Sequence, residues 1–340
     1  MNMASNDFHQ TTVPRTTVEV HLPDGRILCG PRNRPIAAFL RCLPEWNQQD
    51  PIMGAVINGE LCELTHPVEL DSRVRLVKMS GPDGSGIYRR SITFLLEAAF
   101  EDTFPTADIS IDHSLSSGGF YCSVINRVPL SREELAAVEA RMKELAKADL
   151  PFERKVVPLQ DAIAYFQSKG QDEKVQLLKF RSKDTLVLYK LRDRCDYHHG
   201  FMVPSTGYLR WFALTPMNGG FALRFPRRQA PNELPPLADS KKLLATFREY
   251  NDWLVRLGIE NVGALNTAIQ AKRVSELILI SEALHEHRIA EIASLVMERS
   301  KEARIVLVAG PSSSGKTTFS KRLTVQLLAQ GISPFPLELD

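Results

Sequence analysis

The feature that most constrains this chain is a loop rich in glycine and serine near its end. Residues 310–317, GPSSSGKT, fit the pattern G-x-x-x-x-G-K-[ST] at every fixed position. The β-branched run RIVLVAG precedes the loop, and the amphipathic pattern TFSKRLTVQLLAQ follows it. Strand, glycine-rich loop and helix in this order are the context of a phosphate-binding loop. The pattern therefore predicts the start of a P-loop NTPase (α/β) domain over residues 303–340, with a second strand in PFPLELD.

The residue types in the loop indicate phosphate chemistry. Backbone N–H groups can converge on a phosphate where side chains do not crowd the loop and glycine permits a positive φ. The Lys316 ammonium would contact the β- and γ-phosphates, and the Thr317 hydroxyl suits Mg²⁺. The predicted cofactors are therefore ATP and Mg²⁺. The predicted phosphate-binding residues are Gly310, Ser312, Ser313, Ser314, Gly315, Lys316, Thr317 and Thr318.

Asp340 ends the second predicted strand and is the candidate catalytic residue. In doubly wound sheets the ligand lies beyond the carboxyl ends of the strands, so Asp340 would face the place where an acceptor hydroxyl meets the γ-phosphate. Its carboxylate could act there as a general base. The alternative is a terminal aspartate with no role.

The overall charge argues against one class of function. Lysine and arginine number 42 against 40 acidic residues, which gives a formal net charge of +2. This balance excludes a chain whose main function is to neutralise a nucleic-acid backbone. A local basic patch predicts either a basic linker or an RNA contact. It consists of Arg224, Arg227 and Arg228, interleaved with Phe221 and Phe225.

The cysteines and the apolar runs indicate the compartment. The five cysteines include no C-x-x-C pair and lie in separate segments, which favours free thiols in a reducing environment. The first residues lack the pattern of a signal peptide, and no apolar run approaches the length of about 18 residues that a membrane span needs. We therefore expect a cytoplasmic protein with no membrane contact.

The chain ahead of residue 303 divides into four predicted parts. Residues 1–14 form a disordered N-terminus, residues 81–228 an α+β domain, and residues 229–302 a linker and helical connector. Residues 15–80 show strand, strand, helix, strand and strand, with Asp-Gly and Asn-Gly turns. This order indicates a β-grasp domain, and the alternative is a small β domain of no distinctive kind. The predicted fold class is a multidomain chain of α+β and α/β parts.

The end of the chain resembles a kinase family. AGPSSSGKTTFSKRL followed by PFPLELD is similar to the start of the uridine kinase and phosphoribulokinase family, whose second strand ends in a Leu-Asp pair. The resemblance implies that Asp340 accepts the proton of a nucleoside hydroxyl during ATP-dependent phosphoryl transfer. Members of that family have a much longer kinase domain, so we expect this chain to be truncated early in that domain and incomplete for catalysis.

The front of the chain resembles a different family. VEVHLPDGR, INGELCEL, VEARMKELAKADLPFER and CDYHHGFMVPSTGYLRWFAL are similar to the N-terminal half of threonyl-tRNA synthetase, over about residues 15–225. In that family a TGS domain of β-grasp type precedes an editing domain whose site uses an H-x-x-x-H pair and a C-x-x-x-H pair. Cys195 and His199 keep the second spacing, but Arg90 and Phe94 stand at the first. The resemblance implies a residual editing-like site without activity.

The order of the two resemblances is that of bacterial nucleoside kinases fused behind a synthetase-like TGS and editing module. The first expectation is a uridine kinase-like enzyme with a small-molecule nucleoside as acceptor. The alternative is an RNA-associated binding or regulatory module with a nucleotide-binding P-loop and no editing activity. Cys195, His198 and His199 are too few for a structural zinc site, which needs four ligands, and their partner pair is missing, so no metal site is predicted.

Overall fold

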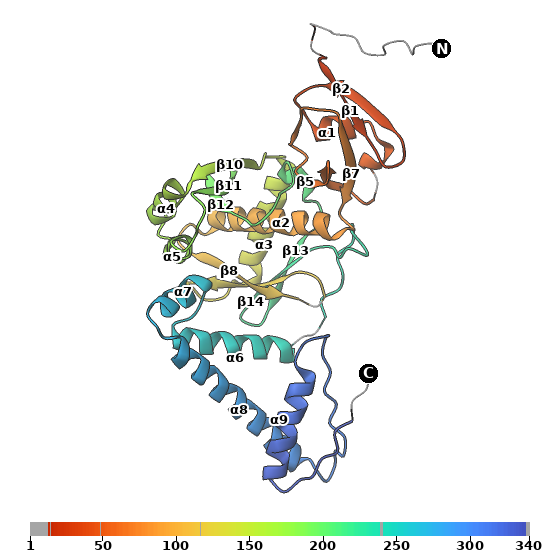
Figure 1. The fold of residues 1–340 in the computed structure, drawn as a ribbon. Coiled ribbons are helices and arrows are strands. Elements are labelled where there is room, and N and C mark those ends of the chain that lie inside the picture. The colour runs from red at the N-terminus through yellow and green to blue at the C-terminus, as the bar shows by residue number, and fades with distance from the viewer. Residues whose placement is uncertain (1–12, 14, 48, 116, 239–240, 338–340) are drawn as a thin grey trace, which may run out of the picture. The chain divides into compact units, whose positions relative to one another are not determined.

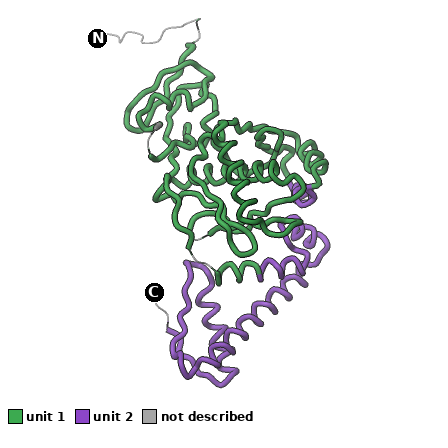
Figure 2. Tube along the Cα trace, turned by 180° about the vertical axis from the view of Figure 1, so that it is seen from behind, with its two compact units in different colours: residues 1–170, 182–248 green, residues 171–181, 249–340 purple. Residues whose placement is uncertain are grey.

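The computed structural model describes residues 13, 15–47, 49–115, 117–238 and 241–337. The chain separates into two compact units, residues 1–170 with 182–248 and residues 171–181 with 249–340 (Figure 2). The described part is a mixed α+β structure with several sheets. Apart from residue 13, the predicted disordered N-terminus lies outside the described residues.

A five-stranded sheet with order β2-β1-β7-β4-β5 begins the first unit (Figure 1). Strands β1 and β7 are parallel and the other neighbours antiparallel. The hairpins turn where the sequence predicts, with φ of 86° at Gly25, 51° at Asn58 and 92° at Gly59. The strands are β1 (Thr17–His21), β2 (Ile27–Pro31), β4 (Ile52–Ile57), β5 (Glu60–Cys62) and β7 (Ser72–Lys78).

One helix closes the core of this sheet. The helix α1 (Ile36–Leu40) buries Ile36 and Leu40 against inward residues of the strands such as Val20. Because side chains alternate between the faces of a strand, residues such as Arg73 and Arg75 of β7 are exposed. The remaining short elements are β3 (Arg34–Pro35), β6 (Pro67–Val68) and η1 (Pro44–Asn47).

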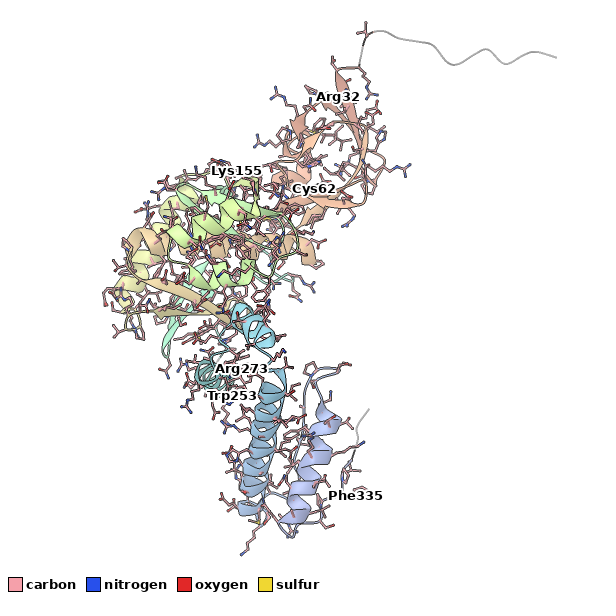
Figure 3. All side chains as sticks on the ribbon, turned by 60° about the vertical axis from the view of Figure 1, so that its left-hand side comes forward. Arg32, Cys62, Lys155, Trp253, Arg273 and Phe335 are labelled. Carbon is pink, nitrogen blue, oxygen red and sulfur yellow. The ribbon has the colours of Figure 1, made fainter. Side chains whose placement is uncertain are left out.

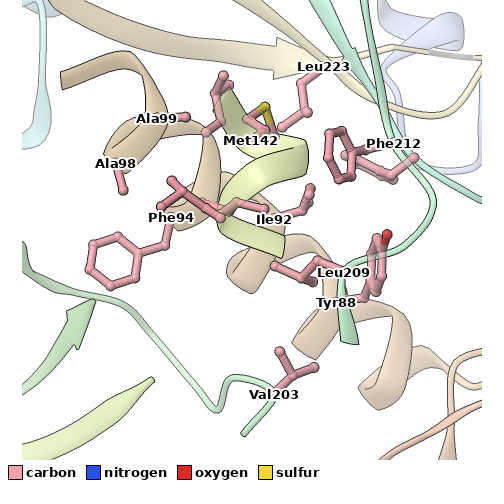
Figure 4. Packing of buried hydrophobic residues seen from close by; sticks show 14 of the residues in the cluster. Tyr88, Ile92, Phe94, Ala98, Ala99, Met142, Val203, Leu209, Phe212 and Leu223 are labelled. Carbon is pink, nitrogen blue, oxygen red and sulfur yellow. The ribbon is translucent and has the colours of Figure 1, made fainter. Parts of the chain in front are cut away.

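Two helices form the centre of the rest of the first unit. The helix α2 (Pro82–Thr103) is buried along much of its length, and α3 (Arg132–Lys147) packs beside it. Figure 4 shows Phe94, Ile92 and Met142 in this core with Phe212 and Leu223. The predicted capping box starts α3: the Glu134 N–H donates to Ser131 Oγ (3.1 Å), and the Ser131 N–H donates to Glu134 Oε2 (2.9 Å).

Two antiparallel sheets complete this unit. The orders are β13-β14-β9-β8 and β10-β11-β12, and β13 and β10 are edge strands. The first sheet contains β8 (Asp108–Ser114), β9 (Phe120–Ile125), β13 (Ala213–Met217) and β14 (Gly220–Arg224). The second contains β10 (Glu153–Pro158), β11 (Thr185–Leu191) and β12 (Arg194–Tyr197), and the helices nearby in sequence are α4 (Leu159–Ser168) and η2 (Thr206–Tyr208).

An aromatic stack fixes the first part of a further helix to β8. The ring of His113 lies 5.1 Å from that of Tyr121 and 4.1 Å from that of Phe247, which belongs to α6 (Lys241–Leu257). Next to it, Arg248 Nη2 donates to Tyr121 Oη (2.9 Å). The stack therefore holds residues 247–248 in the first unit.

The second unit is helical in its described residues. Its helices are α5 (Asp172–Leu178), α7 (Val262–Gln270), α8 (Val274–Glu298), α9 (Lys316–Ala329) and the end of α6. The pattern over 241–300 predicts helix, and the structure divides it at Gly258 and Lys272, which have φ of 68° and 61°. A small core joins α8 and α9, with Ile289 and Leu323 buried.

The two strands predicted around the glycine-rich loop are absent from the described residues. Residues 303–310 and 332–337 are irregular, with Ile305 and Leu307 77% and 83% exposed. A strand exists through its ladder hydrogen bonds, and no described strand lies beside 303–310 to supply them. The prediction of two strands here is therefore wrong for the described residues, and these residues do not show a P-loop NTPase domain.

Candidate functional site

Cys195 and His199 lie at the end of the sheet formed by β10, β11 and β12. Cys195 is in β12 opposite Lys190, and its N–H donates to the hydroxyl of Tyr165 (3.1 Å). The ring of His199 meets that of Tyr197 edge-on at 5.8 Å. The C-x-x-x-H pair thus spans the last strand and the turn that follows it.

The helix α2 presents Arg90 and Phe94 to the same segment. Arg90 Nε donates to the carbonyl of Phe201 (2.9 Å), and the ring of Phe94 lies 5.2 Å from that of His198. Phe94 has no exposed surface, and burial lowers the pKa of Arg90 from its ordinary value. The structure therefore brings Arg90 and Phe94 against the segment 198–201, which contains His199.

Gly200 makes this close approach of helix and turn possible. Its φ is 112°, a backbone conformation that a residue with a side chain rarely adopts. A Cβ placed on Gly200 would lie 2.8 Å from Arg90 Cζ. The glycine therefore leaves the space that the Arg90 guanidinium occupies.

A partly buried ionic cluster positions β12 against α2. Arg194 pairs with Glu97 (3.2 Å), Glu101 (2.7 Å) and Asp196 (3.5 Å), and Asp196 is buried. Burial opposes the charged form of Arg194, but the carboxylates outweigh it and raise the pKa of that guanidinium. Because Arg194 and Asp196 flank Cys195, the cluster fixes the orientation of its backbone. Among the described residues, no group of three or more His, Cys, Asp or Glu side chains could hold a metal ion.

The N-terminal sheet contributes a contact that the sequence pattern did not reveal. The Tyr189 hydroxyl donates to Glu63 Oε1, and the Met202 N–H donates to the same oxygen (3.4 Å). Tyr189 is only 1% exposed, and its ring lies 6.5 Å from that of His198. Glu63, which directly follows β5 of the N-terminal sheet, therefore supports the turn after β12, which belongs to a different sheet. The two partners are 126 residues apart, so no local motif could have indicated the pair.

In the glycine-rich loop, positive φ values occur at Gly315 and at Ser313, and not at Gly310. Ser313 and Gly315 have φ of 60° and 82°, and Gly315 caps the start of α9. Lys316 Nζ donates to the carbonyls of Gly310 (3.0 Å) and Pro311 (2.8 Å). The remaining predicted residues lie in the same loop and in the first turn of α9: Ser312, Ser314, Thr317 and Thr318. The predicted catalytic residue, Asp340, lies outside the described residues.

The basic patch at 224–228 has a structural role. Phe221 and Phe225 are buried, Arg224 Nη2 donates to the carbonyl of Pro235, and Arg227 Nε donates to that of Ser117 (3.1 Å). Buried rings cannot stack on bases, so the patch is not the aromatic and basic groove that single-stranded RNA needs.

Two general features of the described residues complete this survey. All five cysteines are free thiols, and Cys29 and Cys42 are exposed while Cys122 is buried; Cys62 is labelled in Figure 3. Within the described ranges, no helix combines the length and apolar character needed to cross a membrane.

Comparison with known proteins gives one consistent result. No family model matches the chain. A threonine--tRNA ligase of Methylibium petroleiphilum is 36% identical over 170 residues, which cover 50% of this chain and 27% of the ligase. One of Geobacter sp. (strain M21) is 32% identical over 204 residues, 60% of this chain and 32% of the ligase. One of Azoarcus sp. (strain BH72) is 30% identical over 216 residues, 63% of this chain and 33% of the ligase.

These relatives correct the functional prediction. They are named as tRNA ligases, a different enzyme class from a nucleoside kinase, and they give no support to a fused uridine kinase domain. The prediction of a uridine kinase-like phosphotransferase is therefore wrong, because a phosphate-binding loop is shared by many classes and does not choose among them. The chain spans about a third of the length of the curated relatives it matches. Over about half of its own length it is similar to threonine--tRNA ligases.

Proposed function

We propose that this chain is a tRNA-binding module related to threonyl-tRNA synthetase, and that it binds the acceptor end of a tRNA without hydrolysing the aminoacyl ester. The observation that carries the proposal is the composition of the site between α2 and β12. Cys195 and His199 remain, while α2 supplies Arg90 and Phe94. Compared with the editing site that the sequence resembles, this site lacks the two histidines of the first pair, which are half of the groups that the hydrolysis uses. The groups that remain support binding.

The chemistry of the two replacements explains the loss. Ester hydrolysis needs a group that can take a proton from the attacking water within hydrogen-bond reach. Phe94 has no polar atom, and an arginine stays protonated and has no acceptor. A guanidinium is, however, well suited to bind a phosphate or a carboxylate. Arg90 therefore supports anion binding where the resembled site has a histidine.

The finer domain assignments belong to this proposal. We assign residues 15–80 to a TGS-like β-grasp domain, on the strand order and the single packed helix. Residues 81–228 would be the editing-like α+β domain, and residues 229–302 the linker and helical connector. Residues 303–340 would contain the phosphate-binding loop.

Seryl-tRNA deacylation tests the catalytic half of the proposal. We expect the parent chain to release serine no faster than the buffer, while fluorescence anisotropy shows that it binds the tRNA. The double variant Arg90→His/Phe94→His restores the H-x-x-x-H pair, and circular dichroism must show that it folds because Phe94 is a core residue. We expect the folded variant to gain deacylation that Cys195→Ala removes. If the parent chain deacylates seryl-tRNA and either Cys195→Ala or His199→Ala abolishes that activity, the proposed loss of editing activity is refuted. Absence of tRNA binding by the folded parent chain would refute the binding role.

A second ligand is favoured by the glycine-rich loop. We propose that residues 310–318 bind the phosphates of a nucleoside triphosphate with Mg²⁺, with Thr317 as the Mg²⁺ ligand, in a binding or regulatory role. The Lys316 ammonium already lies on two carbonyl oxygens of the loop, and phosphate oxygens could replace these. The positive φ at Ser313 and Gly315 supports a loop with inward N–H groups.

Nucleotide titration tests this second ligand. Lys316→Ala should lose most of the affinity for Mg-ATP, and Thr317→Ala should lose the dependence on Mg²⁺. Lys321→Ala is the matched control, because Lys321 is an exposed lysine of the same helix. Equal affinity of Lys316→Ala and Lys321→Ala would refute the loop as the phosphate site.

A further inference from the structure

An open groove runs along one side of α3. It consists of two adjoining hollows of about 630 and about 310 Å³ that share Lys143. The first lies between α3 and β13, and the second between the end of α3 and the segment 207–212. Ala136 and Ala140 are among its lining residues, and their short side chains keep it open.

The groove is lined by cations. Four of its side chains are basic, namely Arg132, Lys143, Lys147 and Arg210. The one carboxylate among the lining residues, Glu139, accepts from the Leu214 N–H (2.7 Å) and pairs with Lys143 (2.5 Å). Its charge is therefore already compensated inside the groove.

Apart from Glu139, the acidic residues of α3 lie outside the groove lining. Glu133 accepts from Ser131, and Glu144 pairs with Arg141 (2.8 Å). Glu134 belongs to the capping box. The charges of this helix are thus segregated, and the groove side carries the positive excess.

The dimensions of the groove suit a polyanionic chain. Arg132 and Lys147 are fifteen residues apart on α3, which at about 1.5 Å per residue corresponds to about 22 Å. One strand of a nucleic-acid duplex carries a phosphate about every 3.4 Å of axis. The groove could therefore follow about six phosphates of one strand.

The neighbouring sheet edge argues against a peptide strand as the occupant. Adding a strand to β13 would need its outward N–H groups. That of Leu214 is already bonded to Glu139, and Pro216, two residues further along the same edge, has none. The edge is therefore closed to strand addition beside the cationic groove.

We propose that the α3 groove binds the phosphate backbone of RNA, with Arg132, Lys143, Lys147 and Arg210 as the contacting cations. This inference rests on the proposed tRNA-binding function and assigns a surface to it. Because such contacts involve phosphates and not base edges, binding at the groove is independent of sequence.

The test compares two double variants of the full chain with a fluorescently labelled tRNA transcript. Lys147→Ala/Arg210→Ala removes two groove cations and leaves the pair of Lys143 and Glu139 intact. The matched control, Lys169→Ala/Lys183→Ala, removes two exposed lysines of the same unit from outside the groove. Anisotropy titrations at several salt concentrations give Kd and its salt dependence, and circular dichroism confirms that each variant is folded.

The expected result is a Kd raised about tenfold or more at low salt for the groove variant alone, and a slope of log K against log salt that falls by about 1.5. A parent chain that binds no tRNA would refute the proposed function together with the groove. A parent chain that binds, with a groove variant that matches the control, would refute the groove alone. A parallel titration with poly-glutamate tests an acidic protein as the occupant. If the groove variant loses poly-glutamate binding while its tRNA binding is unchanged, the groove belongs to an acidic protein and the proposal is overturned.

Discussion

Removing the Glu63 carboxylate should destabilise the first unit through one buried hydroxyl. In Glu63→Ala the Tyr189 O–H loses its acceptor, and Tyr189 is only 1% exposed, so water cannot replace the carboxylate without opening the core. A hydrogen bond to a charged group contributes about 1.5–3 kcal/mol, and a buried unsatisfied donor costs a similar amount. Because Glu63 itself is half-buried, we expect a loss of about 2 kcal/mol.

Denaturant unfolding followed by tryptophan fluorescence measures this loss. Trp253→Phe is the background, because the two tryptophans that remain, Trp46 and Trp211, both belong to the first unit. Tyr189→Phe removes the donor, so Glu63→Ala should cost much less when it is added to Tyr189→Phe than when it is made alone. A coupling of about 1 kcal/mol or more is the expected outcome. Additive losses in the double variant would show that the two side chains do not stabilise the unit through each other.

Three further predictions concern single side chains. Burial lowers the pKa of His113, with Arg248 acting in the same direction and Asp112 against it, so the stability of the folded state should fall as the pH drops below about 6.5. In a pH series of unfolding midpoints, His113→Phe should flatten this acidic part of the profile. Burial raises the pKa of Tyr88, so the folded state should lose stability as the pH rises above about 10. If Tyr88→Phe shows the same loss of stability above about pH 10 as the parent chain, Tyr88 is not the group responsible. Phe94 has no exposed surface, so Phe94→Ala should cost about 3–5 kcal/mol in denaturant unfolding, and a cost below about 1 kcal/mol would show that the ring is not part of the core.

Features encoded within a few residues could be predicted from the sequence. The Asn58-Gly59 turn and the Ser131 capping box depend on local backbone preferences, and the structure contains both. Local patterns failed where a distant partner decides the outcome.

The apolar run at 304–310 illustrates the first failure. Its β-branched residues favour a strand, but a strand also needs a neighbour, and none is present among the described residues. The pair of Glu63 and Tyr189 illustrates the second, since it joins two sheets across a long stretch of chain. The α3 groove was missed for the same reason, because Arg210 joins the cations of α3 only in the folded chain.

The contact between Gly200 and Arg90 restricts the order in which this site can change. The guanidinium is held by the Phe201 carbonyl, so it cannot simply swing away from a new side chain at position 200. Any substitution at Gly200 must therefore follow a shortening of Arg90, and even then it meets the unfavourable φ of 112°. A directed-evolution route from this site toward an esterase would therefore begin at Arg90 on the helix, and we expect variants of Gly200 that keep Arg90 to be destabilised.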